Sequence, residues 1–212
     1  MVYLLVVSLF WAFSFGLIKG VLTGVPSTFV SFARVFLAFL VFLPFFKKRN
    51  LNLKKALFLC ALGGIQYGFM YLAYIYAFAF LKAYEVALFT IFTPFFVAFL
   101  AHFREQKINP LLWLAVILAI FGTGFVIYQE PPHSAFLKGF LILQLSNFAF
   151  AFGQIEYKIF MNKNKTLKDF DVFALLYAGA SFVCLPFLFF SGGFDAVFSL
   201  SLKQIGVLIY LG

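Results

Sequence analysis

Charged residues are scarce in this chain. Of its 212 residues, 11% are Asp, Glu, Lys or Arg and 65% are hydrophobic, and the mean hydropathy is +1.05. A soluble domain of this length exposes far more polar surface, so the composition excludes one. The seven acidic residues are scattered. An enzyme acting on lipid inside a membrane needs clustered carboxylates, a His pair or an activated nucleophile, so that class is only a minor alternative.

Cysteine and histidine are also rare, with two residues of each. Cys60 and Cys184 lie inside apolar runs, where we expect them to pack rather than to form a disulfide. No Cys/His cluster has the spacing of metal ligands, and no phosphate-binding loop motif is present. We therefore expect no catalytic residue, no metal, no cofactor and no ATP hydrolysis by this chain.

Long apolar runs dominate what is present. Each is about 20 residues long, the length that a helix needs to cross a hydrocarbon core. The sequence thus predicts an all-α polytopic membrane protein, with most of its 36 Phe residues facing lipid. An eighth run begins near Gln204 and is only partly contained in the sequence, so we expect a fragment. The predicted complete spans are Tyr3–Leu22, Thr28–Phe46, Ala56–Phe78, Tyr84–Phe103, Leu111–Tyr128, Leu137–Phe160 and Phe170–Phe190.

Basic residues gather in alternate connections between these spans. Short cytoplasmic loops carry the excess of Lys and Arg, which predicts a cytoplasmic amino terminus and a multi-pass protein of the inner membrane. The basic residues behind the net charge of +9 are then expected to lie next to anionic lipid headgroups. We expect no nucleic-acid partner, because no basic face suited to nucleic acid exists outside the spans. The cations concerned are Lys47, Lys48, Arg49, Lys54, Lys55, Arg104, Lys107, Lys163, Lys165 and Lys168.

The sequence contains an internal repeat. Residues 12–18 match residues 149–155 at five of seven positions, and Val41–Phe45 is echoed by Val183–Phe187 at nearly the same distance downstream. The copies lie in the first and sixth spans, and this odd offset of five places them in opposite orientations, an architecture of secondary transporters. We expect a complete five-helix repeat over residues 1–130 and the start of a second repeat over 137–212, with two helices and part of a third.

Polar and aromatic residues inside the spans are the candidates for a solute site. Tyr67, Tyr71 and Tyr74 recur at helical spacing, and such a stripe suits a small amphipathic organic solute; its alternative is core packing. Span six is rich in polar residues that either bind a solute or join helices. The predicted substrate-binding residues are Trp11, Ser14, Gln66, Tyr67, Tyr71, Thr90, Asn147 and Gln154.

Two ionisable residues fall near one level of the membrane. Arg34 and Glu85 are predicted as charge partners of each other or of a charged solute; the alternatives are snorkelling for Arg34 and a solvated interfacial position for Glu85. Glycines spaced four apart, in residues 16–24 and 64–68, predict flat helix faces for close packing. Pro94 removes a backbone hydrogen bond within span four and predicts a static kink or a hinge there.

Several motifs resemble those of the EamA-type transporters of the drug/metabolite transporter superfamily, over almost the whole chain. Two segments, Gln66–Tyr71 and Tyr84–Thr90, are similar to the branch proposed for carboxylates, amino acids and amines. The family resemblance implies ten helices in two inverted five-helix repeats, of which the second is incomplete in this sequence. The motifs are Trp11–Phe15, Pro26 with Ala33-Arg34, Leu43-Pro44, Ala87–Thr90, Thr93-Pro94, Arg104-Glu105 and Gly122–Gly124.

The leading hypothesis is a secondary transporter that moves an amino acid, an amine or a carboxylate across the inner membrane by alternating access. The alternatives are a non-functional or partner-dependent fragment of such a transporter and, less favoured, the lipid-acting enzyme. The expected partners are a small-molecule solute and the lipid bilayer, and the sequence leaves the oligomeric state open.

Overall fold

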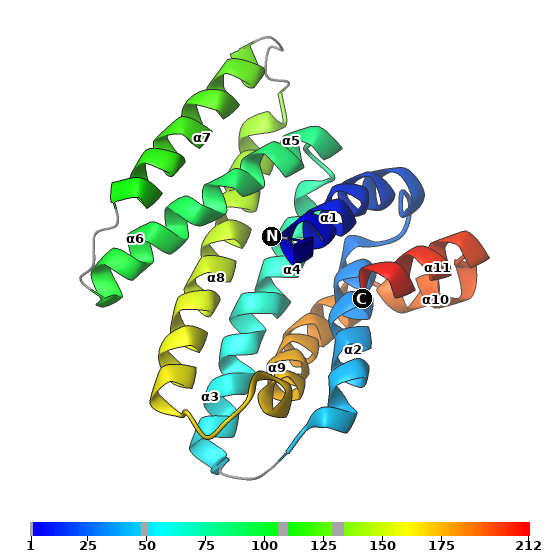
Figure 1. Cartoon of the computed structure of the whole chain (residues 1–212). Coiled ribbons are helices and arrows are strands. Elements are labelled where there is room, and N and C mark those ends of the chain that lie inside the picture. Colours follow the sequence, from blue (N-terminus) through cyan, green and yellow to red (C-terminus); the bar gives the residue numbers. More distant parts are fainter. Residues whose placement is uncertain (1, 48–50, 106–109, 129–133) are drawn as a thin grey trace.

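A computed structural model describes residues 2–47, 51–105, 110–128 and 134–212. Helices joined by short turns make up these residues, and they contain no strand (Figure 1). The α-helices are α1 Val2–Val21, α2 Ser27–Phe42, α3 Leu53–Gly63, α4 Met70–Ala77, α5 Ala83–Phe89, α6 Thr93–Glu105, α7 Pro110–Tyr128, α8 Phe136–Lys163, α9 Asp169–Phe190, α10 Ala196–Ser199 and α11 Leu202–Leu211.

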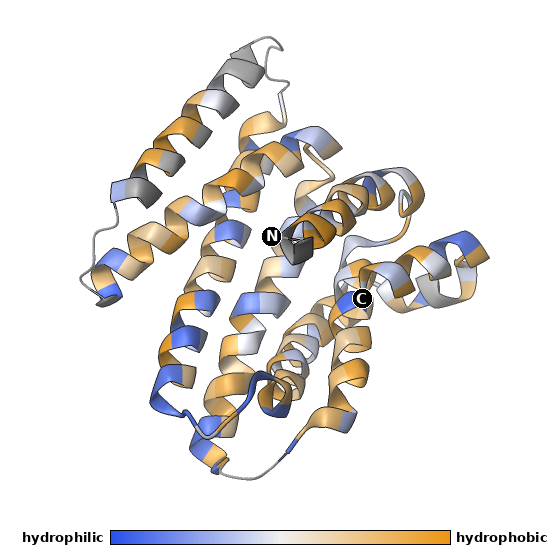
Figure 2. Cartoon of the chain, in the orientation of Figure 1, coloured by the Kyte–Doolittle hydropathy of each residue, from blue (hydrophilic) through white to orange (hydrophobic). Residues whose placement is uncertain are grey.

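The prediction of an all-α polytopic membrane protein is confirmed. Hydrophobic residues cover most of the ribbon, and hydrophilic ones gather where helices end, as between α8 and α9 (Figure 2). Large apolar side chains face outward, including Phe13, Phe182 and Phe190, which are 66%, 77% and 92% exposed. Within the described residues, the stretches long and apolar enough to cross a membrane are Ser27–Phe45, Leu53–Ala77, Ala83–Arg104, Phe136–Lys163 and Asp169–Phe190.

The helices match the predicted spans to within a few residues, except that two spans are not regular. Span three contains a π-helical segment, η2, at Gly64–Phe69 between α3 and α4. Span four is broken by a 3₁₀ turn, η3, at Thr90–Phe92 between α5 and α6. Of the predicted cytoplasmic cations, Lys48, Arg49 and Lys107 lie outside the described residues, as does residue 130 at the predicted repeat boundary.

Glycines allow α9 to lie directly on α3 and η2. A Cβ at Gly63 would overlap the carbonyl oxygen of Leu176, and one at Gly179 would overlap that of Cys60. Added Cβ atoms at Gly64 and Gly68 would lie 2.9 Å from Val183 Cγ2 and 3.0 Å from Ala180 O. The predicted packing face of Gly64 and Gly68 is therefore confirmed. The close contact also includes Gly63 on α3 and Gly179 on α9.

The prediction for the first span is partly wrong. Gly24 lies beyond the end of α1 with φ +87°, so it belongs to the turn into α2 and not to a helix face. Added Cβ atoms at Gly16 and Gly20 would meet nothing within 4 Å. Spacing alone therefore predicted a contact surface that the described part of the chain does not use.

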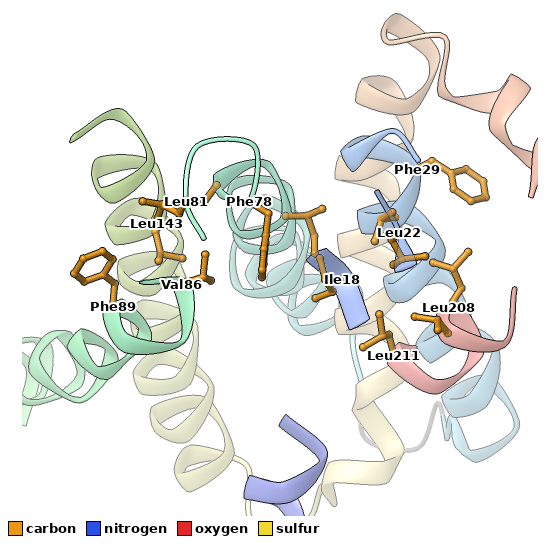
Figure 3. Packing of buried hydrophobic residues seen from close by; sticks show 14 of the residues in the cluster. Ile18, Leu22, Phe29, Phe78, Leu81, Val86, Phe89, Leu143, Leu208 and Leu211 are labelled. Atoms are coloured by element: carbon orange, nitrogen blue, oxygen red, sulfur yellow. The ribbon is translucent and has the colours of Figure 1, made fainter. Parts of the chain in front are cut away.

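A hydrophobic core joins α1, α2, α4, α5, α8, α9 and α11 (Figure 3). Ile18 of α1 and Leu22, just after that helix, pack there with Phe78 and Leu81 of the α4–α5 turn and with Leu208 of α11. Lys19 Nζ donates to the carbonyl oxygen of Phe78 at the end of α4 and so caps that helix. This core fixes α1 and α5 beside the cavity described next.

Candidate functional site

A cavity of about 460 Å³ lies between α1, α2, α4, α5, α6 and α8, a size typical of sites for small molecules. Its walls are aromatic and apolar, with a few polar groups distributed among them. The lining residues are Trp11, Ser14, Phe15, Arg34, Met70, Tyr71, Tyr74, Ala87, Thr90, Ile91, Thr93, Pro94, Ser146, Asn147, Phe150 and Gln154.

The lining contains six of the eight residues predicted to bind substrate: Trp11, Ser14, Tyr71, Thr90, Asn147 and Gln154. Both copies of the repeated segment contribute to it. Residues 12–18 supply Ser14 and Phe15 from α1, and residues 149–155 supply Phe150 and Gln154 from α8. The internal repeat therefore borders the cavity from two sides.

Gln66 and Tyr67, the other two predicted residues, lie outside the lining. Gln66 is 3% exposed, packs where a Cβ of Gly153 would be, and donates from Nε2 to Tyr67 Oη at 3.3 Å. The Tyr67 ring stacks on Tyr177 of α9 with 4.8 Å between ring centroids. Of the three tyrosines in the predicted stripe, two therefore line the cavity and one does not. Tyr71 and Tyr74 reach the cavity, and Tyr67, one turn further along, is packed between helices.

A second, shallower hollow of about 500 Å³ lies between α1 and the start of α5. It shares Trp11, Phe15, Ala87 and Thr90 with the cavity. Small residues, including Ala12, Gly16 and Ala83, line part of it. The two hollows therefore adjoin at the α1–α5 contact.

Polar side chains of α8 bond to backbone carbonyls of the neighbouring spans. Ser146 Oγ donates to Met70 O at 2.9 Å, at the junction of η2 and α4. Asn147 Nδ2 donates to Phe89 O at 2.9 Å and to Gln144 Oε1 at 3.2 Å. These contacts match the alternative that polar residues of span six join helices, although both side chains also border the cavity.

The Asn147 contact explains how the break in span four is accommodated. Pro94 has no N–H to donate to the carbonyl four residues back. The backbone N–H of Thr93 donates to Thr90 O in the 3₁₀ turn, which leaves Phe89 O for the Asn147 side chain. The bend is therefore stabilised by a neighbouring helix, as in the static-kink interpretation of Pro94.

We expect Asn147→Leu to destabilise the protein by about 1–2 kcal/mol, because it leaves Phe89 O without that partner inside a membrane span. Thermal unfolding of the purified protein in detergent measures the effect. Gln144→Leu is the matched control, since it removes the second acceptor of Asn147 but leaves the bond to Phe89 O intact. Equal losses for the two variants would contradict this role.

The predicted Arg34–Glu85 ion pair does not form. The guanidinium of Arg34 lies over the Tyr71 ring, with Cζ 4.4 Å from the ring centroid, and Nη2 donates to Tyr71 Oη at 3.3 Å. Glu85 Oε2 accepts from the backbone N–H of Lys82 at 2.6 Å and caps the start of α5. Glu85 is 7% exposed, so the interpretation of a solvated side chain is wrong. The carboxylate is buried because it accepts the backbone N–H at the start of α5.

Glu156 of α8 forms an ion pair with Arg104 in the last turn of α6. Arg104 Nε of α6 donates to Glu156 Oε1 at 2.6 Å, and Glu156 is 8% exposed. This ion pair ties α6 to α8 away from the lining of the cavity. The ion pair gives this buried carboxylate a structural role between the two helices.

Sequence reasoning missed the apolar part of the lining, which includes Phe15, Met70, Ala87, Ile91 and Phe150. A polar residue within a membrane span is unusual and can be recognised in the sequence. An apolar residue that lines a cavity cannot be distinguished in the sequence from one that faces lipid. Helical spacing carried a usable signal: Ala87 precedes Thr90 by three, Phe150 follows Asn147 by three, and Met70 precedes Tyr74 by four.

Comparisons with known proteins agree with this architecture. The model of the EamA-like transporter family matches residues 1–128. Among curated proteins, the biotin transporter of Salmonella typhimurium is 34% identical over 216 residues, and that of Escherichia coli is 33% identical over 216; each match covers 100% of this chain and 71% of the relative. A probable biotin transporter of Pseudomonas aeruginosa is 36% identical over 212 residues, covering 99% of this chain and 73% of the relative.

No solved structure is significantly similar to the chain. The family match and the curated relatives nevertheless agree over most of its length, and the resemblance seen in its motifs is confirmed. This multi-pass membrane protein belongs to the EamA-like transporter family.

Proposed function

We propose that this chain is a secondary transporter whose solute, a small organic carboxylate, occupies the cavity between α1, α2, α4, α5, α6 and α8. The observation that carries the proposal is the position of the cavity between the two copies of the repeated segment. Solute sites of inverted-repeat transporters lie at the interface of their repeats. The family model ends at residue 128, which supports a first repeat over 1–130 and a second that begins at 137.

Biotin is the candidate solute, because the curated relatives carry that name. Biotin is a carboxylate whose aliphatic chain joins an apolar, sulfur-containing ring, and that ring is fused to a cyclic urea. The rings of Trp11, Phe15 and Tyr74 offer walls for the apolar part, and Asn147 and Gln154 offer amide groups for the urea. We place the protein in the inner membrane with a cytoplasmic amino terminus, as its distribution of Lys and Arg indicates.

Uptake of radiolabelled biotin into liposomes containing the purified chain tests this proposal. We expect uptake above that of protein-free liposomes, and we expect Tyr71→Ala to lower it roughly tenfold because the variant removes a ring from the cavity wall. Tyr76→Ala is the matched control: Tyr76 lies on the same helix, is 44% exposed and does not line the cavity. Absence of biotin uptake, or equal loss in both variants, would argue against it.

A further inference from the structure

Arg34 has an incomplete set of contacts. Its Nε and Nη1 atoms are buried and have no hydrogen-bond partner among the described residues, and Nη2 has only the 3.3 Å bond to Tyr71 Oη. A guanidinium carries five N–H donors and stays charged at any physiological pH. The ring of Tyr71 beneath it supplies a cation–π contact but accepts no hydrogen bond from these two nitrogens. Among the described residues, this partly buried positive charge therefore has no compensating anion.

The described part of the chain supplies no carboxylate for this charge. The lining of the cavity contains no Asp or Glu. Of the two buried acids, Glu85 caps α5 and Glu156 is paired with Arg104. Snorkelling does not account for Arg34 either, because its guanidinium is held on Tyr71 within the lining instead of extending to the membrane surface. Within the part of the chain that the structure describes, Arg34 therefore has no anionic partner.

We infer that Arg34 is the residue that receives the carboxylate of the solute and makes the cavity selective for organic monoanions. The inference rests on the proposed function and specifies the substrate class of the same site. The planar fork of a guanidinium matches the two oxygens of a carboxylate, and stacking on Tyr71 fixes the plane of that fork. Trp11, Phe15 and Tyr74 then accept the apolar body of the solute.

This assignment separates the three solute classes that the sequence left open. An amine or a zwitterionic amino acid brings an ammonium group into the cavity, and the described lining has no carboxylate to pair with it. A desolvated charge without a partner is strongly unfavourable. The cavity therefore favours monocarboxylates over amines and amino acids.

Fluorescence of Trp11 provides a direct binding measurement, because Trp11 lines the cavity and Trp113 packs against Phe95 outside it. Trp113→Phe leaves Trp11 as the single tryptophan. In this background the purified chain is titrated with biotin and with its neutral primary amide, which has nearly the same shape. We expect the acid to bind roughly 100-fold more tightly than the amide, the effect of about two charge-assisted hydrogen bonds.

Arg34→Gln should abolish this preference by weakening the acid while changing the amide less than about threefold, and Arg34→Lys should restore only part of it because an ammonium lacks the planar fork. Lys54→Gln, at an exposed cation outside the cavity, should change neither affinity. Thermal unfolding of each variant shows whether it is folded. Equal weakening of acid and amide by Arg34→Gln, or equal binding of both molecules by the unchanged chain, would overturn the assignment.

Failure of the proposed function gives a different result. If neither biotin nor its amide binds, biotin is not the solute, and quenching of Trp11 by iodide against neutral acrylamide then decides the role of Arg34. A cavity that attracts anions through Arg34 should show iodide quenching that falls at least about twofold in Arg34→Gln with acrylamide quenching unchanged. Iodide quenching that does not depend on Arg34 would overturn the anion site itself.

Discussion

Gly179→Val should cause the largest loss of stability of any single change considered for this chain. The Cβ of any residue at this position overlaps the carbonyl oxygen of Cys60, and neither backbone can move without separating α9 from α3. Overpacking of a well-packed contact costs about 1–3 kcal/mol, and more where the obstacle is backbone. We expect the unfolding temperature in detergent to fall by roughly 10 °C or more, since about 1 kcal/mol corresponds to 2–4 °C at this size.

Gly20→Val is the matched control for this prediction. Gly20 also lies in an apolar helix, α1, but a Cβ there meets no atom within 4 Å. The control should therefore unfold within a few degrees of the unchanged protein, because only the small helix propensity difference applies. Similar melting of the two variants would show that the close approach of α3 and α9 does not limit stability.

Ala87→Phe should have the largest effect on transport. Ala87 lines both the cavity and the adjoining hollow between α1 and α5, so a phenyl ring at this position fills the proposed solute site without displacing a packed side chain. We expect biotin uptake into liposomes to fall more than about 20-fold, as when a binding cavity is filled. The unfolding temperature should stay within a few degrees of the original.

Ala61→Phe supplies the control for this substitution. Ala61 is exposed on α3 and lies outside both hollows, so the same added ring faces outward there. Uptake by this variant should match that of the unchanged chain. Retained uptake in Ala87→Phe would place the solute path elsewhere in the protein.

The sequence predicted the helices well because the bilayer itself sets their length. A hydrocarbon core demands about 20 apolar residues per span, and charged residues mark where each span leaves it. The irregular segments were harder to predict. Pro94 predicted the break at η3 because it lacks an N–H. No comparable residue predicted the π-helical segment at Gly64–Phe69. A π segment inserts a residue into a helix without any fixed sequence signal.

The site was predicted in part for a related reason. Helical spacing correctly placed Tyr71 beside Tyr74, with 6.3 Å between their ring centroids, but it gives only the face of a helix. How deep along that face the cavity extends depends on other helices. Tyr177 of α9 covers Tyr67, and α8 comes so close at Gly153 that it buries Gln66. Arg34 was recognised as unusual, but its partner was identified only when Tyr71 was placed beneath it.

The break in span four has a mechanical consequence. Because Thr93 donates to Thr90 O and the side chain of Asn147 takes up Phe89 O, no continuous ladder of i to i−4 bonds runs from α5 into α6. At this point a side-chain bond from α8 takes the place of a backbone bond within the span. The angle between α5 and α6 is therefore set in part by α8, which supplies this bond and packs on α5, η3 and α6.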